Sequence, residues 1–198
     1  MSKSSELRAK ARKALGGNIF DKAWLMALVA CLVITVANFV GLIPVVGTIG
    51  LIVIAGAVNV GVFGYFLKLV RGENPEFIDT VDGFKNDFVG NFLLGFMHDL
   101  FICLWTLLFI IPGIIATYSY SMAYYIKNDH PEYKWNECLK ESKRMMKGYK
   151  WKLFCLEFSF IGWHIVAAFV PVVGSWFVSP YVHAAQASFY EELKANNG

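Results

Sequence analysis

Two acidic residues lie within apolar stretches of the chain, and they are the first candidates for chemistry. Asp99 has His98 beside it, and Glu157 has His164 seven residues further on, which is the same face of a helix. An ionised carboxylate is costly to hold among apolar groups, so each acid indicates a functional site or a fixed partner. A first interpretation is a polar cavity for a proton-coupled or ligand-binding step, with candidate residues Asp99, Glu157, His98, His164, Tyr118 and Tyr120.

A second interpretation of the same acids is structural, and the sequence favours it. Each acid would pair with a histidine, a tyrosine hydroxyl or a lysine and so hold two helices together. Glu157 lies five residues after Lys152, so its segment can place it close to a polar boundary where its charge costs little.

Motifs for metal binding and catalysis are missing from the chain. His98, Asp99, Glu157 and His164 are ligand types that suit zinc or iron, but no pair has the short helical spacing of a metal site. The chain contains no Gly-x-Ser-x-Gly, His-Glu-x-x-His, phosphate-loop or dinucleotide-binding glycine motif. We therefore expect no metal, no cofactor and no enzymatic activity. The four cysteines have no metal-like spacing, and we expect them to be reduced.

The composition indicates a protein that crosses a membrane several times. Hydrophobic residues make up 57% of the 198 residues and charged residues 17%, compared with about 45–50% and about 25% in soluble domains. The charges cluster in blocks separated by long neutral runs. We predict a single membrane domain over 1–198, all-α, with six membrane-spanning helices at 24–43, 49–70, 88–111, 113–127, 152–170 and 175–190.

Proline-containing turns arrange these six spans as three helical hairpins. Pro44, Pro112 and Pro171 follow the first, third and fifth spans, and the first and last of these turns nearly repeat. The second span carries small residues on one face, which predicts the close approach of another helix. The fourth span, 113–127, is short and rich in tyrosine and serine, so it should face protein or water.

The basic residues orient the predicted spans. Six of them lie in the N-terminal segment 1–22, for which a short interfacial helix and a disordered tail are both open. The rest lie around 68–85, around 127–152 and at Lys194. The three turns on the opposite side carry none. Because short loops rich in Lys and Arg stay in the cytoplasm, we place the protein in the cell membrane with both termini cytoplasmic.

A charged amphipathic helix is predicted over 134–147, between the fourth and fifth spans. Trp135, Cys138, Leu139, Ser142 and Met145 recur at helical spacing on one face. The helix is too short and too charged to cross a bilayer, so we expect it at the cytoplasmic face. Two partners are open for its basic side: the acidic loop 71–87, or anionic lipid head groups contacted by Lys140, Lys143, Arg144 and Lys147.

Several motifs along the chain match one family pattern. They are Leu15-Gly16-Gly17-Asn18, Ile111-Pro112-Gly113, Tyr118-Ser119-Tyr120-Ser121-Met122, Met145-Met146-Lys147-Gly148 and Ser159-Phe160-Ile161-Gly162-Trp163. With these motifs the chain resembles the bacterial membrane family called domain of unknown function 975, over nearly its whole length. The resemblance implies a multi-pass protein with no assigned activity. The chain departs from the pattern at Lys134, where relatives often have a helix-capping serine.

These observations lead to two expected functions. The first is a non-enzymatic accessory or envelope-organising component that acts through membrane contacts. The alternative is a small-molecule or lipid transporter or binding protein that uses the intramembrane polar cluster. The expected partners are the lipid bilayer with its anionic head groups and a membrane protein, and nucleic acid is not among them.

Overall fold

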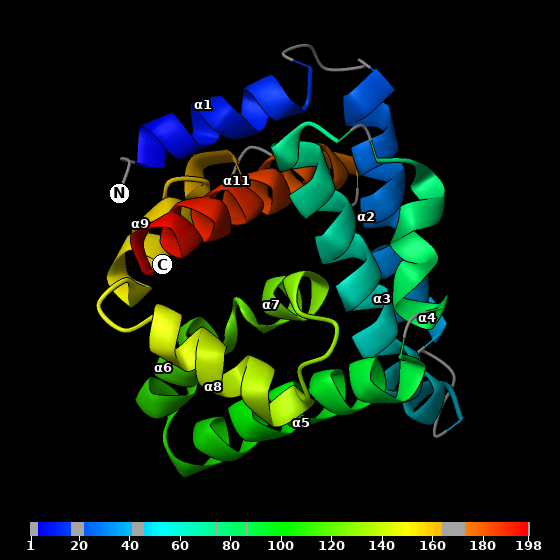
Figure 1. Cartoon of the computed structure of the whole chain (residues 1–198), viewed down its shortest axis with the longest axis vertical. Coiled ribbons are helices and arrows are strands. Elements are labelled where there is room, and N and C mark those ends of the chain that lie inside the picture. The colour runs from blue at the N-terminus through cyan, green and yellow to red at the C-terminus, as the bar shows by residue number, and fades with distance from the viewer. Residues whose placement is uncertain are drawn as a thin grey trace.

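The computed structural model describes residues 4–16, 22–40, 46–73, 75–85, 87–163 and 173–197. These ranges contain helices and no strand, so the predicted all-α class is confirmed for them. The helices shown in Figure 1 are α1 Ser4–Ala14, α2 Lys22–Val40, α3 Val46–Arg71, η1 Phe77–Val81, α4 Asp82–Lys85, α5 Phe88–Leu108, α6 Ile110–Tyr120, α7 Ala123–Asp129, α8 Trp135–Met145, α9 Lys150–Phe158 and α11 Val173–Asn197.

Six membrane spans are not confirmed. Within the described residues, two helices are long and apolar enough to cross a membrane, Ile52–Arg71 in α3 and Phe88–Leu108 in α5. The predicted span 113–127 is divided between α6 and α7, because the chain leaves the helical pattern at Ser121 and Met122. The ends of the predicted spans 24–43 and 152–170, and residue His164, lie outside the described ranges.

The α5–α6 junction lies earlier than the sequence predicted. The Pro112-Gly113 pair was expected to end the third span at residue 111, but α5 ends at Leu108 and the backbone of Phe109 is extended, with φ −158° and ψ 142°. Pro112 is the third residue of α6. Backbone N–H groups in the first turn of a helix have no partner within it, so proline is tolerated there.

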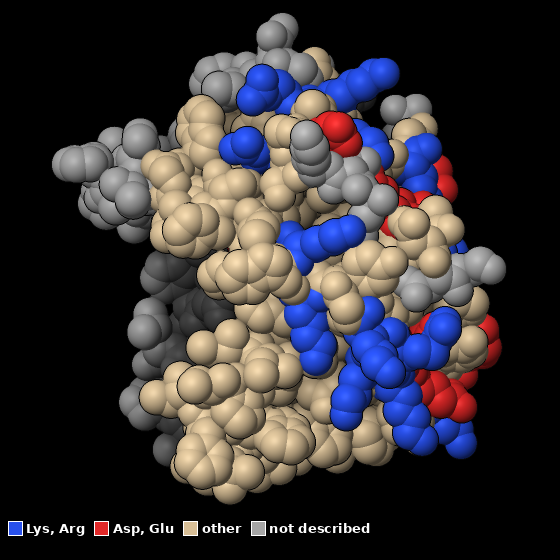
Figure 2. Space-filling model, turned by 90° about the vertical axis from the view of Figure 1, so that its left-hand side faces the viewer, with Lys and Arg blue, Asp and Glu red and all other residues tan. Residues whose placement is uncertain are grey.

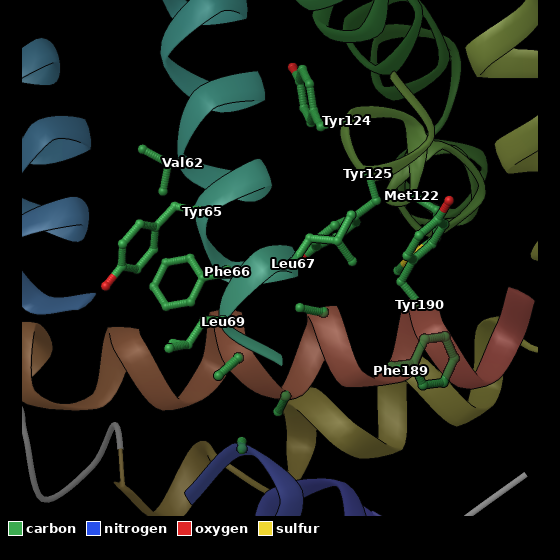
Figure 3. Packing of buried hydrophobic residues seen from close by; sticks show 14 of the residues in the cluster. Val62, Tyr65, Phe66, Leu67, Leu69, Met122, Tyr124, Tyr125, Phe189 and Tyr190 are labelled. Atoms are coloured by element: carbon green, nitrogen blue, oxygen red, sulfur yellow. The ribbon is translucent and has the colours of Figure 1, made fainter. Parts of the chain in front are cut away.

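The core lies where α3 meets α2, α7 and α11. Figure 3 shows aromatic side chains from three of these helices: Tyr65 and Phe66 of α3, Tyr125 of α7 and Tyr190 of α11. The rings of Tyr125 and Tyr190 stack, with centroids 5.2 Å apart. Trp24 of α2 is also fully buried. These large apolar groups fix the spacing of the helices that carry the polar residues described below.

The loop between α3 and α5 folds back onto α3. A Cβ atom at Gly61 would overlap the backbone carbonyl of Thr80 in η1, and one at Gly83 of α4 would overlap the carbonyl of Ala57. Asn91 of α5 also donates from Nδ2 to the Gly83 carbonyl oxygen, at 2.8 Å. Ala57 and Gly61, on the small face predicted for the second span, therefore contact this short connecting segment, and Gly64 on the same face meets Asn128 of α7.

The N-terminal helix α1 lies alongside the C-terminal helix α11 (Figure 1). Its apolar side, which includes Leu7 and Ala11, is fully buried. Lys10 forms an ion pair with Glu192 of α11, with Nζ and Oε1 2.5 Å apart. The basic segment at the start of the chain is thus a helix packed on the protein, with its charged side turned outward.

Candidate functional site

Glu157 of α9 joins three helices through its carboxylate. Its Oε2 accepts a hydrogen bond of 2.7 Å from the Tyr118 hydroxyl of α6, and its Oε1 accepts one of 3.1 Å from Nε2 of Gln186 of α11. The side chain is half-buried. Two neutral donors from different helices fix the orientation of this side chain, and neither of them carries a positive charge.

Glu157 lines an open pocket of about 320 Å³. Apart from Glu157 itself and the two residues that donate to it, the lining is apolar. The lining residues are Tyr118, Phe154, Glu157, Phe158, Phe160, Ile161, Val182 and Gln186. A small number of fixed polar groups in an apolar pocket is the usual design of a site for a small ligand. The arrangement can bind and orient a ligand.

His98, Asp99 and Tyr120 form a second group, separate from this pocket. Nδ1 of His98 lies 2.9 Å from Oδ1 of Asp99, and the His98 ring packs near Tyr120 and Tyr124 at centroid distances of 6.4 and 5.1 Å. The Asp99 side chain is 69% exposed. The structure therefore brings Glu157 and Tyr118 together and places the other described candidates elsewhere, while His164 lies outside the described residues.

Helix α8 covers most of the predicted amphipathic helix and presents its basic residues outward. Lys140, Lys143 and Lys147 are exposed, whereas Arg144 pairs with Glu141 one turn earlier through two hydrogen bonds of 2.5 and 2.9 Å. These bonds lower the pKa of Glu141 below its ordinary value. On the face shown in Figure 2, Lys and Arg side chains gather towards the right, and the tan surface at the lower left carries none.

The expected contact between the acidic loop and the basic segment is made by a different lysine, Lys127 at the end of α7. Its side chain is 4% exposed, and Nζ donates to Oδ2 of Asp87 at 2.8 Å and to the carbonyl oxygens of Pro131 and Tyr133 at 2.8 and 3.0 Å. All three ammonium donors are thus used. The hydrogen bond from Lys127 holds the pKa of Asp87 below its ordinary value.

Ser142 of α8 has a role that sequence reasoning missed. Its hydroxyl donates to the Ser119 carbonyl oxygen at 2.8 Å and accepts from the Met122 backbone nitrogen at 3.2 Å. These two backbone groups flank the break between α6 and α7. The Ser142 hydroxyl, which comes from α8, therefore provides hydrogen-bond partners for backbone groups at this break. A serine within the apolar stripe of α8 was the feature of the sequence that could have indicated this role.

Asp129 at the end of α7 is a second feature that the sequence did not single out. Its carboxylate accepts from Arg71 of α3 at 2.8 Å, and from Lys194 and Tyr190 of α11 at 2.6 and 3.0 Å. Burial opposes ionisation of Asp129, but the hydrogen bonds from Lys194 and Arg71 outweigh it and lower the pKa of the carboxyl. The residue therefore links three helices at the polar end of the core.

The departure at Lys134 removes half of a capping interaction. The lysine side chain cannot accept a hydrogen bond from the helix, but Glu137 still accepts one of 2.7 Å from the Lys134 backbone nitrogen.

In the described part of the chain, no three His, Cys, Asp or Glu residues come together as a metal site requires.

Over the described residues, the fold and the pocket define a class: an all-helical protein with two helices of membrane-crossing length and apolarity and a small apolar pocket lined by one carboxylate. The chain belongs to the family described as "Protein of unknown function (DUF975)", whose family model matches residues 1–116 and 107–197. Comparison with curated proteins and with solved structures finds no significant match.

Proposed function

We propose that this protein is a multi-pass protein of the cell membrane that acts through contacts and not by catalysis. The observation that carries the proposal is the apolar tip of the α5–α6 hairpin. Five consecutive residues, from Leu107 to Ile111, have large apolar side chains that are 62–83% exposed. Such a run is costly in water and is stable in the hydrocarbon of a bilayer.

The rest of α5 supports the same environment. Of the 18 most apolar consecutive residues of α5, 17% are buried. The same measure for α3 is 56%. Helix α5 therefore presents most of its apolar surface outward, and lipid tails would cover it. Lys140 and Lys143 of α8, and Lys147 just after it, would then meet anionic head groups, and both termini would be cytoplasmic.

The depth of two positions in a bilayer tests this proposal. In a variant whose four native cysteines are replaced, a single cysteine is introduced as Ile110→Cys or as Lys140→Cys and labelled with an environment-sensitive fluorophore. After reconstitution, nitroxides placed deep in the lipid tails should quench the label at position 110 and leave the one at 140 bright. Quenching of position 110 by aqueous iodide instead would contradict the proposal.

An accessory role also requires a protein partner. Gentle extraction of the tagged protein from its native membrane, followed by mass spectrometry, should retain one membrane protein at constant stoichiometry. Extraction of the protein with lipids alone would contradict the accessory role. It would favour the second candidate function, which is described next.

The second candidate function is a binding protein for a small molecule or lipid. The pocket around Glu157 favours it, because a carboxylate fixed by Tyr118 and Gln186 faces an apolar space large enough for a ligand. Asp99 stands apart from this pocket, so the proposal assigns it no part in binding.

A further inference from the structure

The charge of Glu157 has no basic partner among the described residues. The ion pairs of this part of the chain use other acids, and the two donors to Glu157 are a phenol and an amide. A carboxylate can accept about four hydrogen bonds, so Tyr118 and Gln186 leave acceptor positions free. A cationic ligand would complete the arrangement.

The walls of the pocket also suit a cation. The rings of Tyr118 and Phe154 meet edge to face at a centroid distance of 6.1 Å, and Phe154 stacks with Phe158 at 5.9 Å. Aromatic faces attract ammonium groups through their quadrupole, and the attraction is stronger where water is excluded. An anionic head group would be repelled by Glu157 and would find no described cation in the lining.

The size and surroundings of the pocket limit the rest of the ligand. Its volume of about 320 Å³ is at the lower end of the range of ligand sites, about 300–1,000 Å³, so it fits one chain or one small group better than a two-chain lipid. Phe158 and Ile161 at its edge are 58% and 47% exposed. These apolar side chains make the entrance suitable for a ligand that arrives from the lipid phase.

We propose that the pocket between α6, α9 and α11 binds the ammonium group of a single-chain amphiphile. Glu157 supplies the opposite charge, Tyr118 and Gln186 hold the carboxylate in position, and the aromatic walls enclose the chain next to the ammonium group. This inference rests on the second candidate function above and names the ligand class of that site.

Binding of matched probes to the full chain in phosphatidylcholine nanodiscs tests the inference. The probes are dodecylamine, dodecanol and dodecanoate, which share one chain and differ in head-group charge. Dodecylamine should bind wild type and raise its unfolding temperature, and dodecanoate should do neither. Glu157→Gln should weaken dodecylamine binding at least about tenfold, because a hydrogen-bonded charge partner is lost. The matched control is Asp99→Asn, which removes an acid outside the pocket and should bind like wild type.

A second variant keeps the test decisive if Glu157→Gln does not fold. Val182→Trp fills the pocket and leaves the carboxylate in place, and it should also lose dodecylamine binding. Lysophosphatidylethanolamine then separates two sources of the ammonium group. Binding of this lipid as well as dodecylamine indicates a lipid head group, and binding of dodecylamine alone indicates a free amine.

Equal dodecylamine affinity in wild type and Glu157→Gln would overturn the inference, and so would dodecanol binding as tightly as dodecylamine. Neither result would affect the membrane proposal, which is judged by fluorophore depth at position 110. If the tip of the α5–α6 hairpin were shown to lie in water, the membrane proposal would be contradicted. This would hold whatever the affinity for dodecylamine.

Discussion

Asp129 shows how one buried carboxylate can hold the polar end of the molecule together. Its side chain is 6% exposed and accepts hydrogen bonds from Arg71, Lys194 and Tyr190. Two of these partners are cations, so the arrangement is stable while Asp129 is ionised. Removal of the charge would leave Arg71 with Glu191 as its remaining partner and Lys194 without this ion pair.

Asp129→Asn should lower the free energy of unfolding at neutral pH by about 2 kcal/mol, the value of a hydrogen bond to a charged group. The pKa of Asp129 is lowered in the folded protein, so its contribution is complete above the ordinary aspartate pKa of about 4. It is lost as the pH falls from there through the folded value. Thermal unfolding of both proteins in detergent should therefore differ at pH 7 and converge in acid.

The matched control for this prediction is Glu132→Gln. Glu132 is an acid on the neighbouring loop with a side chain that is 66% exposed, so its removal should change stability by less than about 1 kcal/mol. A difference between wild type and Asp129→Asn that persists unchanged in acid would contradict the assignment to ionisation.

Ser142→Ala should cost about 1–3 kcal/mol of stability, because it leaves the Ser119 carbonyl and the Met122 N–H without the hydroxyl between them. The loss should appear in thermal unfolding and as faster amide hydrogen exchange at Met122. Lys140→Ala, an exposed change on the same helix, serves as the control. Unaltered exchange at Met122 would mean that the break does not depend on Ser142.

At the scale of the elements, the contact between α3 and the following segment depends on glycine. Gly61→Val should destabilise the protein by at least about 3 kcal/mol, since its side chain would overlap the Thr80 carbonyl and must displace η1. Trypsin should then cut the loop at Arg71 and Lys85 faster than in wild type. Gly162→Ala is the control, because nothing lies within 4 Å of an added Cβ atom there. Equal cleavage of wild type and Gly61→Val would contradict the close packing.

The elements that the sequence predicted well have a strong pattern of their own. Long apolar runs predicted α3 and α5, and the spacing of apolar residues predicted α8. The break between α6 and α7 has no such signal, because Ser121 and Met122 are ordinary helix residues and the break is stabilised by Ser142 from α8. Pro112 gave a misleading signal, since proline is also compatible with the first turn of a helix.

The candidate site was predictable in part for similar reasons. Glu157 and Tyr118 were identified by residue type, because a carboxylate and a tyrosine are unusual within apolar segments. Gln186 was missed, since an amide carries no charge and does not stand out by residue type. Grouping Asp99 with Glu157 required knowledge of which helices are neighbours, and apolar periodicity in a membrane does not give it.

For the whole molecule, the orientation of the chain is open to direct measurement. In the cysteine-replaced variant, single cysteines at Thr48 and Ser175 should react with a membrane-impermeant maleimide on intact cells, and one at Lys134 should react after lysis. This result is expected because the proposed topology keeps the basic segments on the cytoplasmic side. Reaction at position 134 in sealed cells would invert the proposed topology.

The packing of α1 on α11 also determines the order of events during synthesis. Lys10 and Glu192 are 182 positions apart, so α1 leaves the ribosome long before its partner helix exists. Helices α3 and α9 are made earlier but contact α1 less than α11 does, so part of its buried side, which includes Leu7 and Ala11, is uncovered in the interval. The packing of α1 is therefore completed only after α11 has been made.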